Sequence, residues 1–109
     1  MFRTVLKFSG FDVREAGDGF DALNILEQHR VDLVVLDLGL PRLDGLAVHA
    51  EISAHAITRH IPIVIVTGED RDLTQVKAAC VLKKPVTSDQ LVMTVRRCLA
   101  TGGGHADFT

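Results

Sequence analysis

Residues 31–45, with the sequence VDLVVLDLGLPRLDG, constrain the fold of this chain more than any other stretch. Residues 31–36 are almost all apolar and rich in valine, a pattern typical of a strand buried on both faces of a parallel sheet. Asp37 follows directly, and a loop containing Gly39 and Pro41 comes next. Open α/β sheets bind ligands at the carboxyl ends of their strands. The stretch therefore predicts a carboxylate at a binding edge, although an aspartate that caps a turn would give the same pattern.

The remaining residues alternate between helical and strand patterns. Helices are predicted over residues 2–9, 19–29 and 46–54, with a weakly amphipathic helix over 73–79 and a last helix capped by Thr87. Further strands are predicted over residues 11–16, 61–66 and 80–82. Short connections between alternating elements favour a doubly wound α/β fold, with a parallel sheet between two layers of helices.

Size and composition exclude several classes of protein. The 109 residues suffice for one domain, which we place at residues 1–100, followed by a flexible, glycine-rich tail over 101–109. A net charge of −2 without a basic patch argues against nucleic-acid binding. The sequence has no apolar run of membrane-spanning length and no signal peptide, so we expect a cytoplasmic protein that does not bind membranes. Cys80 and Cys98 lack metal-ligand spacing, which favours reduced thiols over a disulfide.

Three predicted strands end on polar residues of complementary kinds. The first ends at Asp37, the second at Thr67 and the third at Lys84. Because parallel strands point the same way, these side chains should meet at one edge of the sheet. A carboxylate can attack phosphorus to form an acyl phosphate, while a lysine and a hydroxyl hold the transferred oxygens. The set therefore predicts a phosphoryl-transfer site, although each residue alone could cap a helix or end a strand.

On three motifs the chain resembles a response-regulator receiver domain of two-component signalling, with a CheY-like, flavodoxin-like fold. The motifs are DLGLPRLDG at residues 37–45, IPIVIVTG at 61–68 and the Lys84-Pro85 pair. The resemblance implies that a sensor histidine kinase or a phosphotransfer protein phosphorylates Asp37 with Mg²⁺. It implies roles for Thr67 and Lys84 at the phosphoryl group, and for the Gly39 carbonyl and Asp37 as metal ligands. Such a domain passes its signal to a downstream protein and is not an enzyme beyond its own phosphorylation and dephosphorylation.

The chain departs from this family at its start. The family's first strand, and the acidic pair that follows it, would lie before Met1. Without that pair we expect Mg²⁺ binding to be weak or absent. Three arrangements would close the gap in the sheet: direct pairing of the two flanking strands, strand exchange in a homodimer, or a longer natural chain, which we favour.

Two further departures from the family affect how the domain would signal to its protein partners. The connection from Thr67 to Lys84 is short for the family, which implies a shortened fourth helix. Val81 occupies the position of an aromatic residue that switches rotamer in relatives. These changes support an alternative: a degenerate pseudo-receiver that binds proteins without phosphorylation. A third hypothesis, an unrelated flavodoxin-like enzyme or ligand binder, lacks a nucleotide or flavin loop. His55 and His60 fit a solvated loop better than a metal site.

Overall fold

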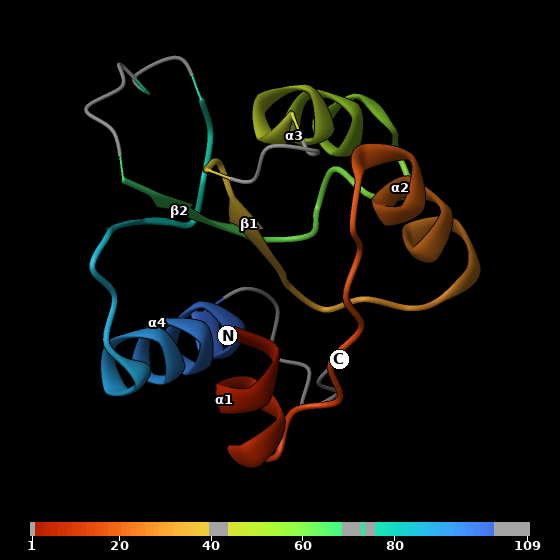
Figure 1. Cartoon of the computed structure of the whole chain (residues 1–109). Coiled ribbons are helices and arrows are strands. Elements are labelled where there is room, and N and C mark those ends of the chain that lie inside the picture. The colour runs from red at the N-terminus through yellow and green to blue at the C-terminus, as the bar shows by residue number, and fades with distance from the viewer. Residues whose placement is uncertain (1, 40–43, 69–72, 74–75, 102–109) are drawn as a thin grey trace.

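The computed structural model of the chain describes residues 2–39, 44–68, 73 and 76–101 (Figure 1). Four helices and three strands are described: α1 (Phe2–Phe8), α2 (Gly19–Gln28), β1 (Val34–Asp37), α3 (Gly45–Ala54), β2 (Ile63–Thr67), β3 (Cys80–Lys83) and α4 (Ser88–Thr101). The strands form a parallel sheet in the order β1-β2-β3. The α/β fold with a parallel sheet is therefore as predicted, and α4 includes Thr101, the first residue of the expected tail.

The sheet lies between two layers of helices. All five residues of β2 are buried, because this strand has a neighbour on each edge and helices on both faces. Val64 and Val66 belong to the core that contains residues of α1 and α4, whereas Ile63 and Ile65 belong to the core on the side of α2 and α3. Figure 1 shows these helix pairs on opposite sides of the sheet. Alternation along the strand thus builds both cores.

Side chains cap helices α2, α3 and α4, and the cap of α4 at Thr87 was predicted from the sequence. The Asp18 carboxylate accepts a hydrogen bond from the Asp21 N–H at 2.8 Å, and the Thr87 hydroxyl accepts one from the Gln90 N–H at 3.1 Å. Asp44 caps α3 in the same way. Such caps satisfy backbone N–H groups that have no partner inside the helix. Gly10, after α1, has a φ of 98°, which a residue without Cβ adopts at no steric cost.

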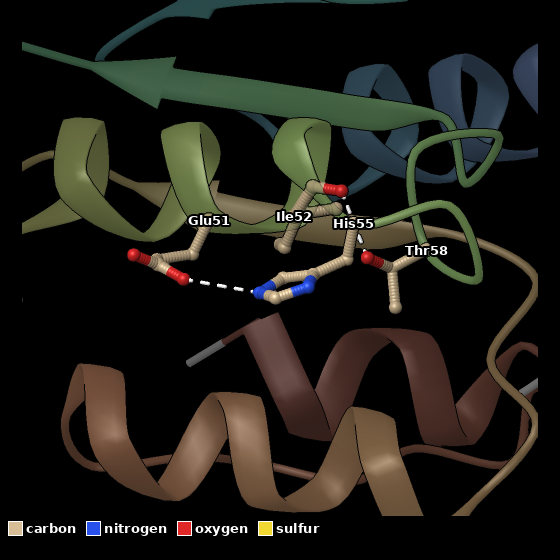
Figure 2. A network of polar contacts seen from close by, with 4 residues as sticks. All are labelled: Glu51, Ile52, His55 and Thr58. Carbon is tan, nitrogen blue, oxygen red and sulfur yellow. Dashed lines mark hydrogen bonds and ion pairs between the residues drawn. The ribbon is translucent and has the colours of Figure 1, made fainter.

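Side chains also fix the end of α3 (Figure 2). The Thr58 hydroxyl donates to the Ile52 carbonyl at 2.8 Å and thereby satisfies one of the last carbonyls of the helix. His55 Nε2 lies 3.3 Å from a Glu51 carboxylate oxygen. Within the described residues no group of three or more His, Cys, Asp or Glu side chains could hold a metal ion. The structure therefore offers no metal cluster at His55 or His60.

The strand predicted over residues 11–16 is wrong. This segment runs past β1 without pairing with it, and a groove of about 620 Å³ lies between them. Phe11 is nevertheless buried in the core beside α1. A strand is defined by hydrogen bonds to a neighbour, and apolar alternation supplies only its buried face. Direct pairing of the two flanking segments, one of the three expected arrangements, is therefore contradicted.

The prediction that the strand at residues 31–36 is buried on both faces is also wrong in part. The strand begins at Val34 rather than Val31, and Leu36 is its one fully buried residue. β1 is the edge strand of the described sheet, so its outer side faces the groove. An unpaired strand edge leaves N–H and C=O groups open to a further strand.

The short helix predicted over residues 73–79 is absent from its described part, since residue 73 and residues 76–79 are not helical. Their backbone groups bond elsewhere: the Ala79 N–H donates to the Ile63 carbonyl, and the Lys77 carbonyl contacts His49 Nε2. Residues 74–75 and most of the expected tail, 102–109, lie outside the described residues. In the described part of the chain, no helix has the length and apolar character needed to span a bilayer.

Candidate functional site

Three strand ends meet at the carboxyl edge of the sheet. Asp37 is the last residue of β1, Thr67 is the last residue of β2, and Lys84 follows β3 directly. Thr67 is in register with Lys83, and Val66 with Asp37. The parallel order of neighbouring strands therefore gathers these residues at one edge.

An ion pair joins two of them. Lys84 Nζ lies 2.9 Å from Asp37 Oδ1, with 14% of the Asp37 side chain and 38% of the Lys84 side chain exposed. The Gly39 N–H donates to the same oxygen at 2.8 Å. One contact places a positive charge on the carboxylate and the other a hydrogen-bond donor. A carboxylate held this way remains accessible from the surface and is oriented by two neighbours.

Backbone contacts fix the position of Lys84. Its N–H donates to the Thr67 carbonyl at 2.8 Å, which continues the parallel ladder one residue beyond β3. The Lys84-Pro85 peptide bond is cis. The Thr67 side chain is buried, with 4% of the residue exposed. Strand β2 and the residue after β3 thus share the wall of the site.

The absence of a side chain at position 39 keeps space beside the carboxylate. A Cβ there would lie 3.1 Å from Lys84 Nζ and 3.3 Å from Asp37 Oδ1, closer than ordinary van der Waals contact. Sequence reasoning assigned a metal-binding carbonyl to Gly39 and missed the N–H that donates to Asp37. The signal was present, because an aspartate two residues before a glycine often accepts a hydrogen bond from that backbone.

The site offers few ligands for a divalent cation. The Asp37 carboxylate and the Gly39 carbonyl are hard oxygen donors of the kind that Mg²⁺ takes. Among the described residues no group of three or more His, Cys, Asp or Glu side chains could hold a metal ion here. Glu69 and Asp70, which follow Gly68 in the sequence, lie outside the described residues. The residues present therefore fit a weak magnesium site that substrate oxygens and water would have to complete.

The groove beside β1 extends to this site. Its wall includes Asp37 and Lys84 at one end, together with apolar residues of both helix layers. Leu6 and Phe11 line it from the α1 side, and Ile52 from the α3 side. The edge of β1 and the carboxylate that follows it therefore share one continuous surface.

The fold and the strand-end residues define a class of protein: a flavodoxin-like α/β domain with an acidic residue and a lysine at the carboxyl edge of its parallel sheet. Comparison with known families identifies the family within this class. The family described as the response regulator receiver domain matches residues 1–96. The chain belongs to this family, and the resemblance noted in its sequence is confirmed.

Individual relatives, both curated proteins and solved structures, support this assignment to the receiver-domain family. The polar-differentiation response regulator DivK of Brucella anthropi is 28% identical over 104 residues, which cover 91% of this chain and 85% of that protein. The receiver domain of NtrX from Brucella abortus superimposes with a TM-score of 0.82 at 27% identity, covering 92% and 88% of the two chains. The receiver domain of the Pseudomonas aeruginosa sensor histidine kinase PA1611, solved with magnesium in its active-site cleft, gives 0.80 at 27% identity, with 90% and 84% covered.

Proposed function

We propose that this receiver domain accepts a phosphoryl group on Asp37 from a histidine kinase or phosphotransfer protein of the cytoplasm, and passes the signal to a downstream protein. The observation that carries the proposal is the ion pair between Lys84 Nζ and Asp37 Oδ1 at the carboxyl edge of the sheet. A carboxylate with an ammonium group beside it can attack a phosphorus atom while the cation stabilises the charge on the transferred oxygens.

The chemistry follows from the positions of the side chains. The Asp37 carboxylate attacks the phosphorus of a phosphohistidine, the P–N bond breaks, and an acyl phosphate forms. Lys84 then neutralises the new group from the position in which it now neutralises the carboxylate. Thr67 ends β2, and its backbone carbonyl accepts a hydrogen bond from the Lys84 N–H. The Thr67 hydroxyl is proposed to bond a phosphoryl oxygen. Bound Mg²⁺, held by Asp37 and the Gly39 carbonyl, would supply further positive charge.

The alternative proposal is a pseudo-receiver that binds protein partners without being phosphorylated. Two observations favour it. The site has few carboxylates in its described part, and Val81, in place of an aromatic residue, is about half exposed on β3. Valine has too small a side chain to carry a signal from the site by swinging between a buried and an exposed position. The two proposals differ in whether Asp37 responds to a phosphoryl analogue.

We expect beryllofluoride with Mg²⁺ to shift the backbone amide resonances of Asp37, Thr67 and Lys84. The analogue binds a carboxylate as a phosphoryl group does, so it changes the hydrogen bonds of the residues around Asp37. The measurement is a two-dimensional amide NMR titration, first with Mg²⁺ alone and then with the analogue added. Because the protein supplies few metal ligands, saturation should require millimolar Mg²⁺. The absence of any Mg²⁺-dependent response would contradict phosphoacceptance and leave the pseudo-receiver.

The homodimer predicted from strand exchange remains a prediction, and the groove beside β1 gives it a location. A strand from a second copy would pair with the open edge of β1 and cover the apolar walls of the groove. We therefore expect static light scattering to give a mass near twice the 11.9 kDa of one chain at high micromolar concentration. A mass of 11.9 kDa across the concentration range would exclude strand exchange without affecting the phosphoacceptor proposal.

A further inference from the structure

The side chain of Leu38 lies between the end of β1 and the first turn of α3. Leu38 follows Asp37 directly, is buried, and belongs to the core on the side of α2 and α3. Its N–H donates to the Val66 carbonyl of β2 at 2.9 Å, which extends the parallel ladder one residue beyond β1. The sheet therefore holds the backbone of Leu38, and the core holds its side chain.

Gly45, the first residue of α3, leaves room for this side chain. A Cβ at position 45 would overlap Leu38 Cδ2, whereas the next nearest atoms, Leu38 Cα and Leu36 Cγ, would lie at 3.5 and 3.6 Å. Gly45 has no positive φ, so its backbone conformation does not require glycine. The Asp44 cap, which accepts the Ala47 N–H at 3.2 Å, fixes the start of α3. The helix can therefore begin this close to Leu38 only because residue 45 has no side chain.

The residues on either side of Leu38 form part of the candidate site. Asp37 precedes it, and Gly39, whose N–H donates to Asp37 Oδ1 at 2.8 Å, follows it. Because the three residues are consecutive, a shift of Leu38 must change the position of the carboxylate, of its donor, or of both. A displacement of about 1 Å at a reacting group can lower a rate on the order of 100-fold.

We propose that Leu38 and Gly45 position the Asp37 carboxylate, because the fit of the Leu38 side chain against the first turn of α3 sets the directions of the carboxylate and of the Gly39 N–H. Leu38 is a positioning residue, which acts through Asp37 and not on the phosphoryl group itself. The expected effect on phosphoryl uptake rests on the proposed function. The expected effect on the Gly39 hydrogen bond does not, so the two can be tested separately.

Gly45→Ala tests the proposal, since the added methyl group forces Leu38 to move. Alanine is a better helix former than glycine, so α3 itself should not be weakened. We expect uptake from acetyl phosphate to slow on the order of 10- to 100-fold. The Gly39 amide proton, followed by NMR without any phosphoryl donor, should exchange with solvent at least about fivefold faster.

Gly19→Ala is the matched control. It adds a methyl group at the first residue of α2, where a Cβ would lie 3.0 Å from Val48 Cγ2, so it crowds a helix contact away from Leu38. Uptake and Gly39 exchange should stay within about twofold of the wild type, as expected for a change that shares no partner with the site. Faster Gly39 exchange in both glycine variants would overturn the proposal.

A second substitution distinguishes positioning from a general loss of structure. Leu38→Val removes the Cδ atoms while the side chain remains apolar, so a Cβ at position 45 no longer meets Leu38 Cδ2. In the double variant, Gly45→Ala should therefore change uptake and Gly39 exchange by less than about threefold relative to Leu38→Val alone. Equal effects of Gly45→Ala in both backgrounds would contradict an action through Leu38.

Two further outcomes remain decisive. If Gly45→Ala unfolds by circular dichroism, Leu38→Val is compared with Ile63→Val, which removes a methylene from the same core. Gly39 exchange should rise at least about threefold in Leu38→Val alone, and an equal rise in both would overturn the proposal. If the wild type takes up no phosphoryl group, the proposed function fails, and Gly39 exchange still decides whether Leu38 positions the carboxylate.

Discussion

Asp37→Asn is expected to abolish phosphoryl uptake from acetyl phosphate. Asparagine matches aspartate in size and can still accept the Gly39 N–H, but its amide has no nucleophilic oxygen comparable to a carboxylate. The wild-type chain should gain the mass of one phosphoryl group, in a form that hydroxylamine releases, as expected for an acyl phosphate. The variant should gain none, a loss of at least about 100-fold. Intact-protein mass spectrometry over a time course measures both.

A matched control separates this effect from a general loss of structure. Asp44→Asn removes a nearby carboxylate, but asparagine caps a helix as well as aspartate, so α3 should be preserved. Uptake by this variant should stay within about twofold of the wild type. The Asp37–Lys84 pair is partly exposed, and its loss should cost under about 1 kcal/mol of stability. Uptake that persists in Asp37→Asn would place the acceptor elsewhere and refute the proposed function.

Local features of this fold could be predicted from sequence because their causes are local. A cap at Asp18 or Thr87 depends on residues three positions apart, and the positive φ of Gly10 depends on the end of one helix. The buried strand β2 could be predicted because its apolar run is continuous and a turn-forming Gly68 follows it.

The incorrect predictions concern features that depend on distant parts of the chain. Residues 11–16 have the alternation of a strand, but a strand needs a paired neighbour, and the described sheet offers none there. The same missing neighbour leaves β1 half-buried.

For the candidate site, the sequence predicted which residues come together but not the contacts between them. A parallel sheet gathers the ends of its strands at one edge, so the convergence of Asp37, Thr67 and Lys84 follows once the order of elements is known. The ion pair and the donation from the Gly39 N–H are finer features that depend on loop geometry. The roles proposed for these residues in phosphoryl transfer rest on their resemblance to the family and on their chemistry, and the variants of Asp37 and Lys84 test them.

Lys84→Met should slow phosphoryl uptake on the order of 100-fold while the protein remains folded. The ammonium group lies 2.9 Å from the Asp37 carboxylate, which we propose as the nucleophile, and removal of one well-placed charge or donor from a transition state typically has an effect of this size. Methionine keeps most of the apolar stem that packs near Gly68. The backbone N–H that bonds the Thr67 carbonyl is unchanged. The rate of mass gain with acetyl phosphate is the measurement.

Lys83→Met is the matched control, because it removes the same charge one residue earlier. Successive side chains of an extended chain point in opposite directions, so Lys83 should not share the position of Lys84 beside Asp37. Its substitution should change the rate by less than about threefold, as expected for a charge that acts through solvent. Equal slowing in both variants would mean that net charge attracts the phosphoryl donor. Slowing in Lys84→Met alone would show that the ammonium group acts on the transferred phosphoryl group itself.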